Sequence, residues 1–210
     1  MAAATTLGYR SIAQMPWEAR LRDHKRVFGE LGHHEAHKHN QAHVLAAVHL
    51  GAGKDADNLT PDQAAPLKVV ADTRNNATTT NADNAATAVK AIDTTSGDEQ
   101  SWVDKMNAAR DKQKAADAAA TDKAYDDAIA HIKTLPSPEA QQAASNVFIK
   151  AMSWVSDAYN AVTKALSDAF ASVVKAINVA IQAVEDAAKA AVHWVEGAAS
   201  SVANFFENLF

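Results

Sequence analysis

Residues 155–196 decide the fold, and they read VSDAYNAVTKALSDAFASVVKAINVAIQAVEDAAKAAVHWVE. Apolar side chains recur every three or four residues along this stretch, in steps close to an 11-residue repeat. Such a repeat has ~3.67 residues per turn, so its apolar side chains stay on one face of a nearly straight helix. We therefore expect one long amphipathic helix from about Pro138 to Glu196, extending for roughly 90 Å at ~1.5 Å per residue. Its apolar face consists of Val155, Tyr159, Val162, Leu166, Phe170, Val173, Ile177, Ile181, Val184, Ala188, Ala191 and Val195.

The segment after Glu196 predicts a short apolar helix. Gly197 is expected to interrupt the long helix, because glycine is a poor helix former. Beyond it, large apolar side chains fall on one side of a helix. Such a cluster is difficult to bury against an alanine-rich chain, since alanine contributes little apolar surface. The cluster consists of Val202, Phe205, Phe206, Leu209 and Phe210.

Two segments in the middle of the chain carry a helix-start signal. Thr60-Pro61-Asp62-Gln63 and Ser96-Gly97-Asp98-Glu99 both match the capping box. Residues 66–95 and 98–134 are therefore predicted to form an antiparallel helical hairpin. The first of these segments is rich in Asn and Thr, which are poor helix formers, so a solvated linker is the competing interpretation.

The N-terminal part also predicts helices. Pro16 can occupy the first turn of a helix that ends at Gly32, and a second helix is expected from about His33 to Leu50. Strand signals are nearly absent throughout. The chain is thus predicted to be all-α, an extended bundle of long amphipathic helices with a short N-terminal helical region.

Three regions are expected. Residues 1–53 form a histidine-rich helical region, residues 54–135 a polar helical hairpin, and residues 136–210 a long amphipathic helix plus a short apolar C-terminal helix. Pro136-Ser137-Pro138 separates the last two, because the residue before a proline disfavours the helical conformation.

Composition narrows the functional classes. The absence of cysteine excludes disulfides and thiolate zinc sites, and a formal net charge of −5 gives no general attraction to nucleic acid. No phosphate-binding glycine loop or nucleophile elbow occurs, so we expect no enzyme and no cofactor. The sequence has neither a secretory signal pattern nor an apolar run of the roughly 18 residues that a transmembrane helix needs. We expect secretion by a signal-independent route or association with a membrane.

The apolar C-terminal face points to a lipid membrane as partner. Amphipathic helices with aromatic anchors bind at the bilayer interface. The 11-residue pattern resembles that of lipid-surface proteins, and the long helices look like those of helical pore-forming toxins. We therefore predict a membrane-active protein, a pore-forming toxin or secreted effector that acts as a homo-oligomer. The same face can also pack inside a bundle, and the two interpretations agree if the bundle opens on lipid. The predicted membrane-contact residues are Trp154, Tyr159, Phe170, Ile177, Ile181, Trp194, Phe205, Phe206, Leu209 and Phe210.

Two other classes remain open. A structural or assembly protein, such as a virion, filament or scaffold subunit, would use the same face for self-association or for a helical protein partner.

A histidine-based metal binder is the third class. His33 and His37, and His39 and His43, are spaced four residues apart, so each pair can chelate one metal from one helix face. The sequence is not the zincin motif, because His37 follows His34-Glu35 one residue too early. A solvated polar face is the simpler interpretation of this cluster.

Overall fold

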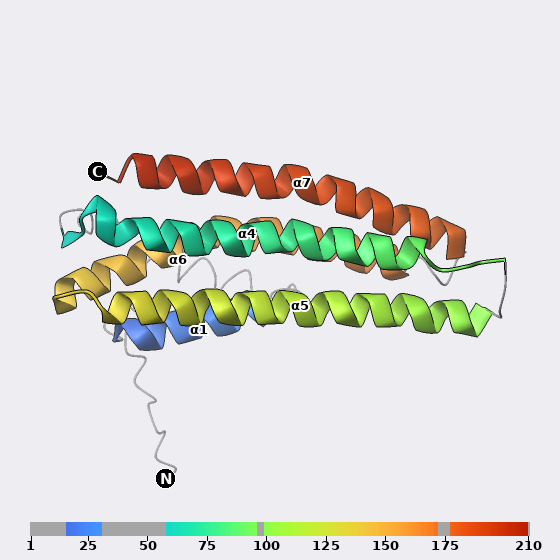
Figure 1. Ribbon diagram of the computed structural model, residues 1–210, viewed down its shortest axis with the longest axis horizontal. Coiled ribbons are helices and arrows are strands. Elements are labelled where there is room, and N and C mark those ends of the chain that lie inside the picture. Colours follow the sequence, from blue (N-terminus) through green and yellow to red (C-terminus); the bar gives the residue numbers. More distant parts are fainter. Residues whose placement is uncertain (1–15, 31–57, 96–98, 172–176, 210) are drawn as a thin grey trace, which may run out of the picture.

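The computed structural model describes residues 16–30, 58–95, 99–171 and 177–209, and it confirms the all-α prediction. Five helices and no strand occur in these residues. The helices are α1 (Trp17–Glu30), α4 (Pro61–Lys90), α5 (Glu99–Lys133), α6 (Pro138–Ala171) and α7 (Ile177–Glu207). The four long helices run alongside one another and make an elongated bundle, with the short α1 against α5 and α6 (Figure 1).

Helix α4 begins where the capping box predicts. The Thr60 hydroxyl accepts from the backbone N–H of Gln63 at 3.4 Å, and the Gln63 side chain accepts from the backbone N–H of Thr60 at 2.9 Å. From there α4 is helical throughout, so the linker interpretation is wrong, and α4 pairs with α5 as the predicted antiparallel hairpin (Figure 1). At the start of α6, the Ser137 hydroxyl accepts from the backbone N–H of Ala140 at 3.1 Å.

One prediction about the C-terminal region is wrong. The expected helix from Pro138 to Glu196 is instead two helices, α6 and α7, which lie antiparallel against each other (Figure 1). A helix of roughly 90 Å would bury only part of its apolar face against α4, which spans roughly 45 Å. Folding back lets both halves of the face reach α4.

The predicted break at Gly197 is also wrong. Helix α7 passes through this residue and ends at Glu207, so no separate terminal helix forms. Glycine costs ~1 kcal/mol in a helix interior. Val195, Ala198 and Val202 on either side are buried, and their packing offsets that cost.

The interior consists of two apolar clusters separated by buried polar side chains. One cluster includes Leu21 and Phe28 of α1, and the other lies toward the opposite end of the bundle. Along α4 and α5 the polar residues fall between the two clusters. We call this group the polar belt: Arg74, Asn75, Thr78, Gln113, Asp117 and Thr121.

Candidate functional site

The structure divides the predicted membrane-contact residues into an inner and an outer group. Phe170, Phe206 and Leu209 are buried, the last two at 8% exposure each. The C-terminal apolar cluster was expected to resist burial, but α6, α7 and α4 enclose much of it. The outer group, whose side chains are half-buried or exposed, consists of Trp154, Tyr159, Ile177, Ile181, Trp194 and Phe205. Phe210 lies outside the described residues.

Three aromatic side chains of this group lie on the α6–α7 hairpin. The Trp154 ring of α6 lies 5.4 Å from the Phe205 ring of α7. Trp194 is 37% exposed and precedes Phe205 by 11 residues, which places both on the same side of α7, roughly 16 Å apart along the helix. We call Trp154, Trp194 and Phe205 the aromatic seam.

A lysine completes the seam. Lys150 Nζ lies 5.0 Å from the centre of the Trp154 ring, within the range of a cation–π contact. Partial burial lowers the pKa of this amine. The seam thus places a cation beside aromatic rings, a combination that is also common at lipid–water boundaries.

Tyr159 has a different environment from the seam. Its ring stacks on Phe28 of α1, with centroids 5.4 Å apart and an interplanar angle of 20°. The Arg74 guanidinium carbon lies 4.9 Å from the Tyr159 ring centre and 5.2 Å from that of Phe28. Tyr159 therefore contributes to the polar belt rather than to the outer surface of the hairpin.

Arg74 is the centre of the polar belt. It is 1% exposed, its Nε donates to Thr121 at 2.9 Å, and its Nη1 donates to Thr78 at 2.8 Å. Its Nη2 has no hydrogen-bond partner among the described residues. Burial lowers the pKa of Arg74, and the negative charge of Asp117 partly counteracts this lowering.

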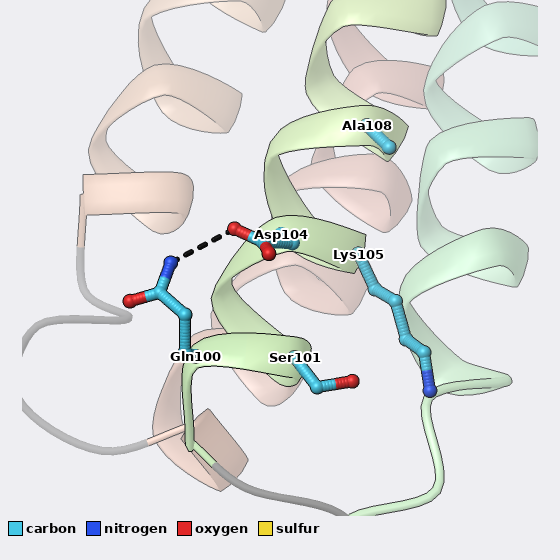
Figure 2. A pocket seen from close by; sticks show the side chains of 5 residues that line it. All are labelled: Gln100, Ser101, Asp104, Lys105 and Ala108. Carbon is cyan, nitrogen blue, oxygen red and sulfur yellow. Dashed lines mark hydrogen bonds between the residues drawn. The ribbon is translucent and has the colours of Figure 1, made fainter.

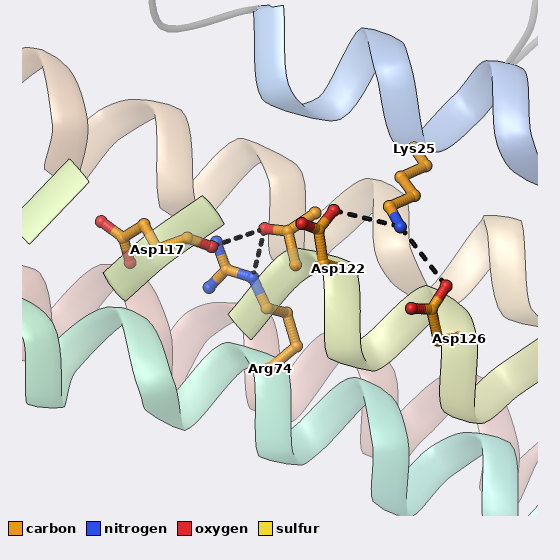
Figure 3. A network of polar contacts seen from close by, with 6 residues as sticks. Lys25, Arg74, Asp117, Asp122 and Asp126 are labelled. Atoms are coloured by element: carbon orange, nitrogen blue, oxygen red, sulfur yellow. Dashed lines mark hydrogen bonds and ion pairs between the residues drawn. The ribbon is translucent and has the colours of Figure 1, made fainter. Parts of the chain in front are cut away.

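Asp117 provides the negative charge of the belt (Figure 3). Its carboxylate accepts hydrogen bonds from Asn81, at 2.8 Å, and from Gln113. Burial raises the pKa of this carboxyl, and the hydrogen bonds and Arg74 act in the opposite direction. A cavity of about 60 Å³ between α4 and α5 lies beside the belt, with Asn81 and Gln113 in its wall.

The belt also ties the two hairpins together. Asn75 of α4 is fully buried, and its Nδ2 donates to the backbone carbonyl of Val195 in α7 at 2.8 Å. Its Oδ1 lacks a partner within the part of the chain that the structure describes. Buried polar groups of this kind favour one register of helix packing.

Sequence reasoning missed the polar belt. The signal was present as polar residues four apart, Arg74 and Thr78 in α4 and Gln113, Asp117 and Thr121 in α5. Spacing of four places side chains on one helix face. Solvated helix faces show the same spacing, so this signal alone does not reveal burial.

The hollow on α5 and the predicted histidine site give no support to a catalytic or metal-binding function. Figure 2 shows an open hollow on the first turns of α5, where Gln100 Nε2 donates to Asp104 Oδ1 at 2.9 Å. Its lining comes from one exposed helix face and brings no catalytic set together. The predicted ligands His33, His37, His39 and His43 lie outside the described residues, and no group of three metal-ligating side chains occurs within those residues.

Within the ranges that the structure describes, no helix combines the length and the apolar character needed to cross a membrane. Comparisons with protein-family models, with curated proteins and with solved structures gave no match to this chain.

Proposed function

We propose that this chain is a membrane-active helical protein that contacts a lipid bilayer through the α6–α7 hairpin. The aromatic seam is the observation that carries the proposal. Indole and phenyl rings beside a lysine suit the interface between headgroups and acyl chains. Contact begins at the seam, where Trp194 is 37% exposed and Trp154 and Phe205 are half-buried.

Opening of the bundle supplies the rest of the apolar surface. The inner faces of α6 and α7 are apolar and pack on α4, and a hairpin that separates from α4 can lay these faces on lipid. In the finer form of the proposal, the protein is a toxin or secreted effector, and several opened copies assemble into a pore. Packing between copies would then shield the polar faces from lipid.

Vesicle experiments test this function. Dye release and co-flotation with phosphatidylcholine vesicles are measured at pH 7 and pH 5. We expect wild-type protein to bind and release dye, and the double variant Trp154→Ser/Phe205→Ser to lose at least tenfold in activity. Val69→Ser is the matched control, because Val69 is 62% exposed but lies on α4. Absence of binding and release at both pH values would refute the function.

A structural or assembly role is the second candidate function, and the outer face of α4 favours it. Its exposed positions between Val69 and Thr87 carry one charge, that of Asp83, although solvated helix faces are usually charged. The Thr73 and Thr80 hydroxyls donate to backbone carbonyls one turn earlier, so these donors already have partners within α4. Such a face fits a second copy of the chain. Sedimentation without lipid tests it, because a defined oligomer that Thr80→Lys dissociates would favour assembly.

A further inference from the structure

Helix α1 fills a gap between two helices of the bundle. α5 and α6 follow one another in the chain but have few direct contacts, and α1 packs against both. It inserts Leu21 and Phe28, which are 0% and 1% exposed. The Tyr125 ring meets Phe28 edge-on at 6.2 Å, and the Tyr159 ring stacks on Phe28. α1 is thus a helix held in an aromatic groove.

Hydrogen bonds and ion pairs also hold α1 in the groove. Trp17 Nε1 donates to Gln141 at 3.2 Å, Arg20 donates to Asn146, and His24 Nδ1 shares a hydrogen bond with the Tyr125 hydroxyl. Lys25 Nζ pairs with Asp122 at 3.0 Å and with Asp126 at 3.4 Å (Figure 3), and Glu18 pairs with Lys133 at 2.7 Å. Ion pairs at partly exposed positions add little stability. A helix of 14 residues is marginal in water by itself, so α1 stays helical only while these contacts hold it in the groove.

The position of α1 matters because Phe28 covers the polar belt. Its ring is one of the two that face the Arg74 guanidinium. When Phe28 leaves, water can reach Arg74 and then Asp117, and it can replace their hydrogen bonds to neighbouring helices. Hydrogen bonds between helices are stronger in a dry interior of low dielectric constant than in water. Removal of α1 therefore weakens the belt, which links α4 to α5 through Arg74 and Thr121 and α4 to α7 through Asn75 and Val195.

We propose that α1 is a latch that must leave its groove before the α6–α7 hairpin separates from α4 and α5. This inference rests on the proposed function for its purpose, since the separated hairpin is the part that covers lipid. Its physical content is independent of lipid. Opening of α6 and α7 is coupled to release of α1.

A covalent lock on α1 tests the latch. The chain has no cysteine, so Lys25→Cys/Asp126→Cys places a single pair of thiols between α1 and α5. A short bismaleimide joins them. The matched control is Lys123→Cys/Asp127→Cys, since these side chains pair at 2.8 Å within α5 and the same reagent leaves α1 untethered. Hydrogen exchange of α6 and α7 is followed without lipid, and dye release with phosphatidylcholine vesicles.

We expect the lock on α1 to slow hydrogen exchange in α6 and α7 at least tenfold relative to the control, and to slow dye release by a similar factor. Equal exchange in the locked and control proteins would overturn the latch, whatever the vesicles show. Slower exchange in the locked protein, with no dye release from either protein, would support the latch and remove the membrane function.

Discussion

Replacement of Arg74 by methionine is the most direct test of the polar belt. The change removes two hydrogen bonds from a charged donor, together about 3 kcal/mol, and contacts with two aromatic rings, about 2 kcal/mol. It also removes the buried Nη2 that lacks a partner, which returns about 2 kcal/mol. The free energy of unfolding should therefore fall by about 3 kcal/mol.

Urea unfolding followed by circular dichroism measures this change, and about 3 kcal/mol corresponds to a midpoint shift of roughly 1 M. Adding Asp117→Asn to Arg74→Met should recover part of the loss, because the carboxylate no longer remains buried without its cation. Arg22→Met is the control, since that side chain is 68% exposed and should change stability by less than about 0.5 kcal/mol. The role of the polar belt is refuted if Arg74→Met is as stable as wild type. It is also refuted if Asp117→Asn lowers the free energy of unfolding by the same amount in the wild-type protein and in the Arg74→Met protein.

Three further predictions concern single side chains. Gly197→Ala should stabilise the protein by about 0.5–1 kcal/mol in thermal or urea unfolding, because a Cβ at this helical position meets nothing within 4 Å, and a loss of stability would show a constraint that the structure lacks. Burial lowers the pKa of His24 to about 4 from its ordinary value of 6.5. Between these two pH values the unfolded state binds a proton that the folded state does not, so the free energy of unfolding should be about 2 kcal/mol lower at pH 5 than at neutral pH. His24→Gln should remove this component of the pH dependence and the exposed His193→Gln should retain it, so equal profiles for the two variants would contradict the assignment. Asn75→Ala should cost about 1 kcal/mol and speed hydrogen exchange around Val195, and unchanged exchange there would mean that this hydrogen bond does not hold α7 on α4.

The closed bundle explains how an alanine-rich chain conceals its apolar stripe. Small side chains such as Ala82, Ala85 and Ala188 lie in the cluster that α4 and α7 share, and they let these helices approach closely. Each of these contacts adds little apolar area, so this end of the bundle depends on the length of the helices, whereas bulky side chains such as Phe148, Ile149 and Met152 are buried in the other cluster.

The sequence by itself determined which segments are helical and where several begin. The Thr60 capping box, the proline pair before α6 and the apolar stripe of residues 155–195 are local signals, since they depend on neighbours one turn away. The placement of Trp194 and Phe205 on one side of α7 also follows from helix geometry alone, because they are 11 residues apart.

Tertiary structure alone decided where the stripe folds back, and which polar residues are buried. Between Ala171 and Ile177 the sequence has no glycine or proline, so nothing local marks the end of α6. The helix ends there because two shorter helices bury more of the stripe on α4 than one long helix would. Likewise Arg74 and Asp117 have the spacing of solvated side chains, and only the packing of α1, α5 and α6 around them removes the water.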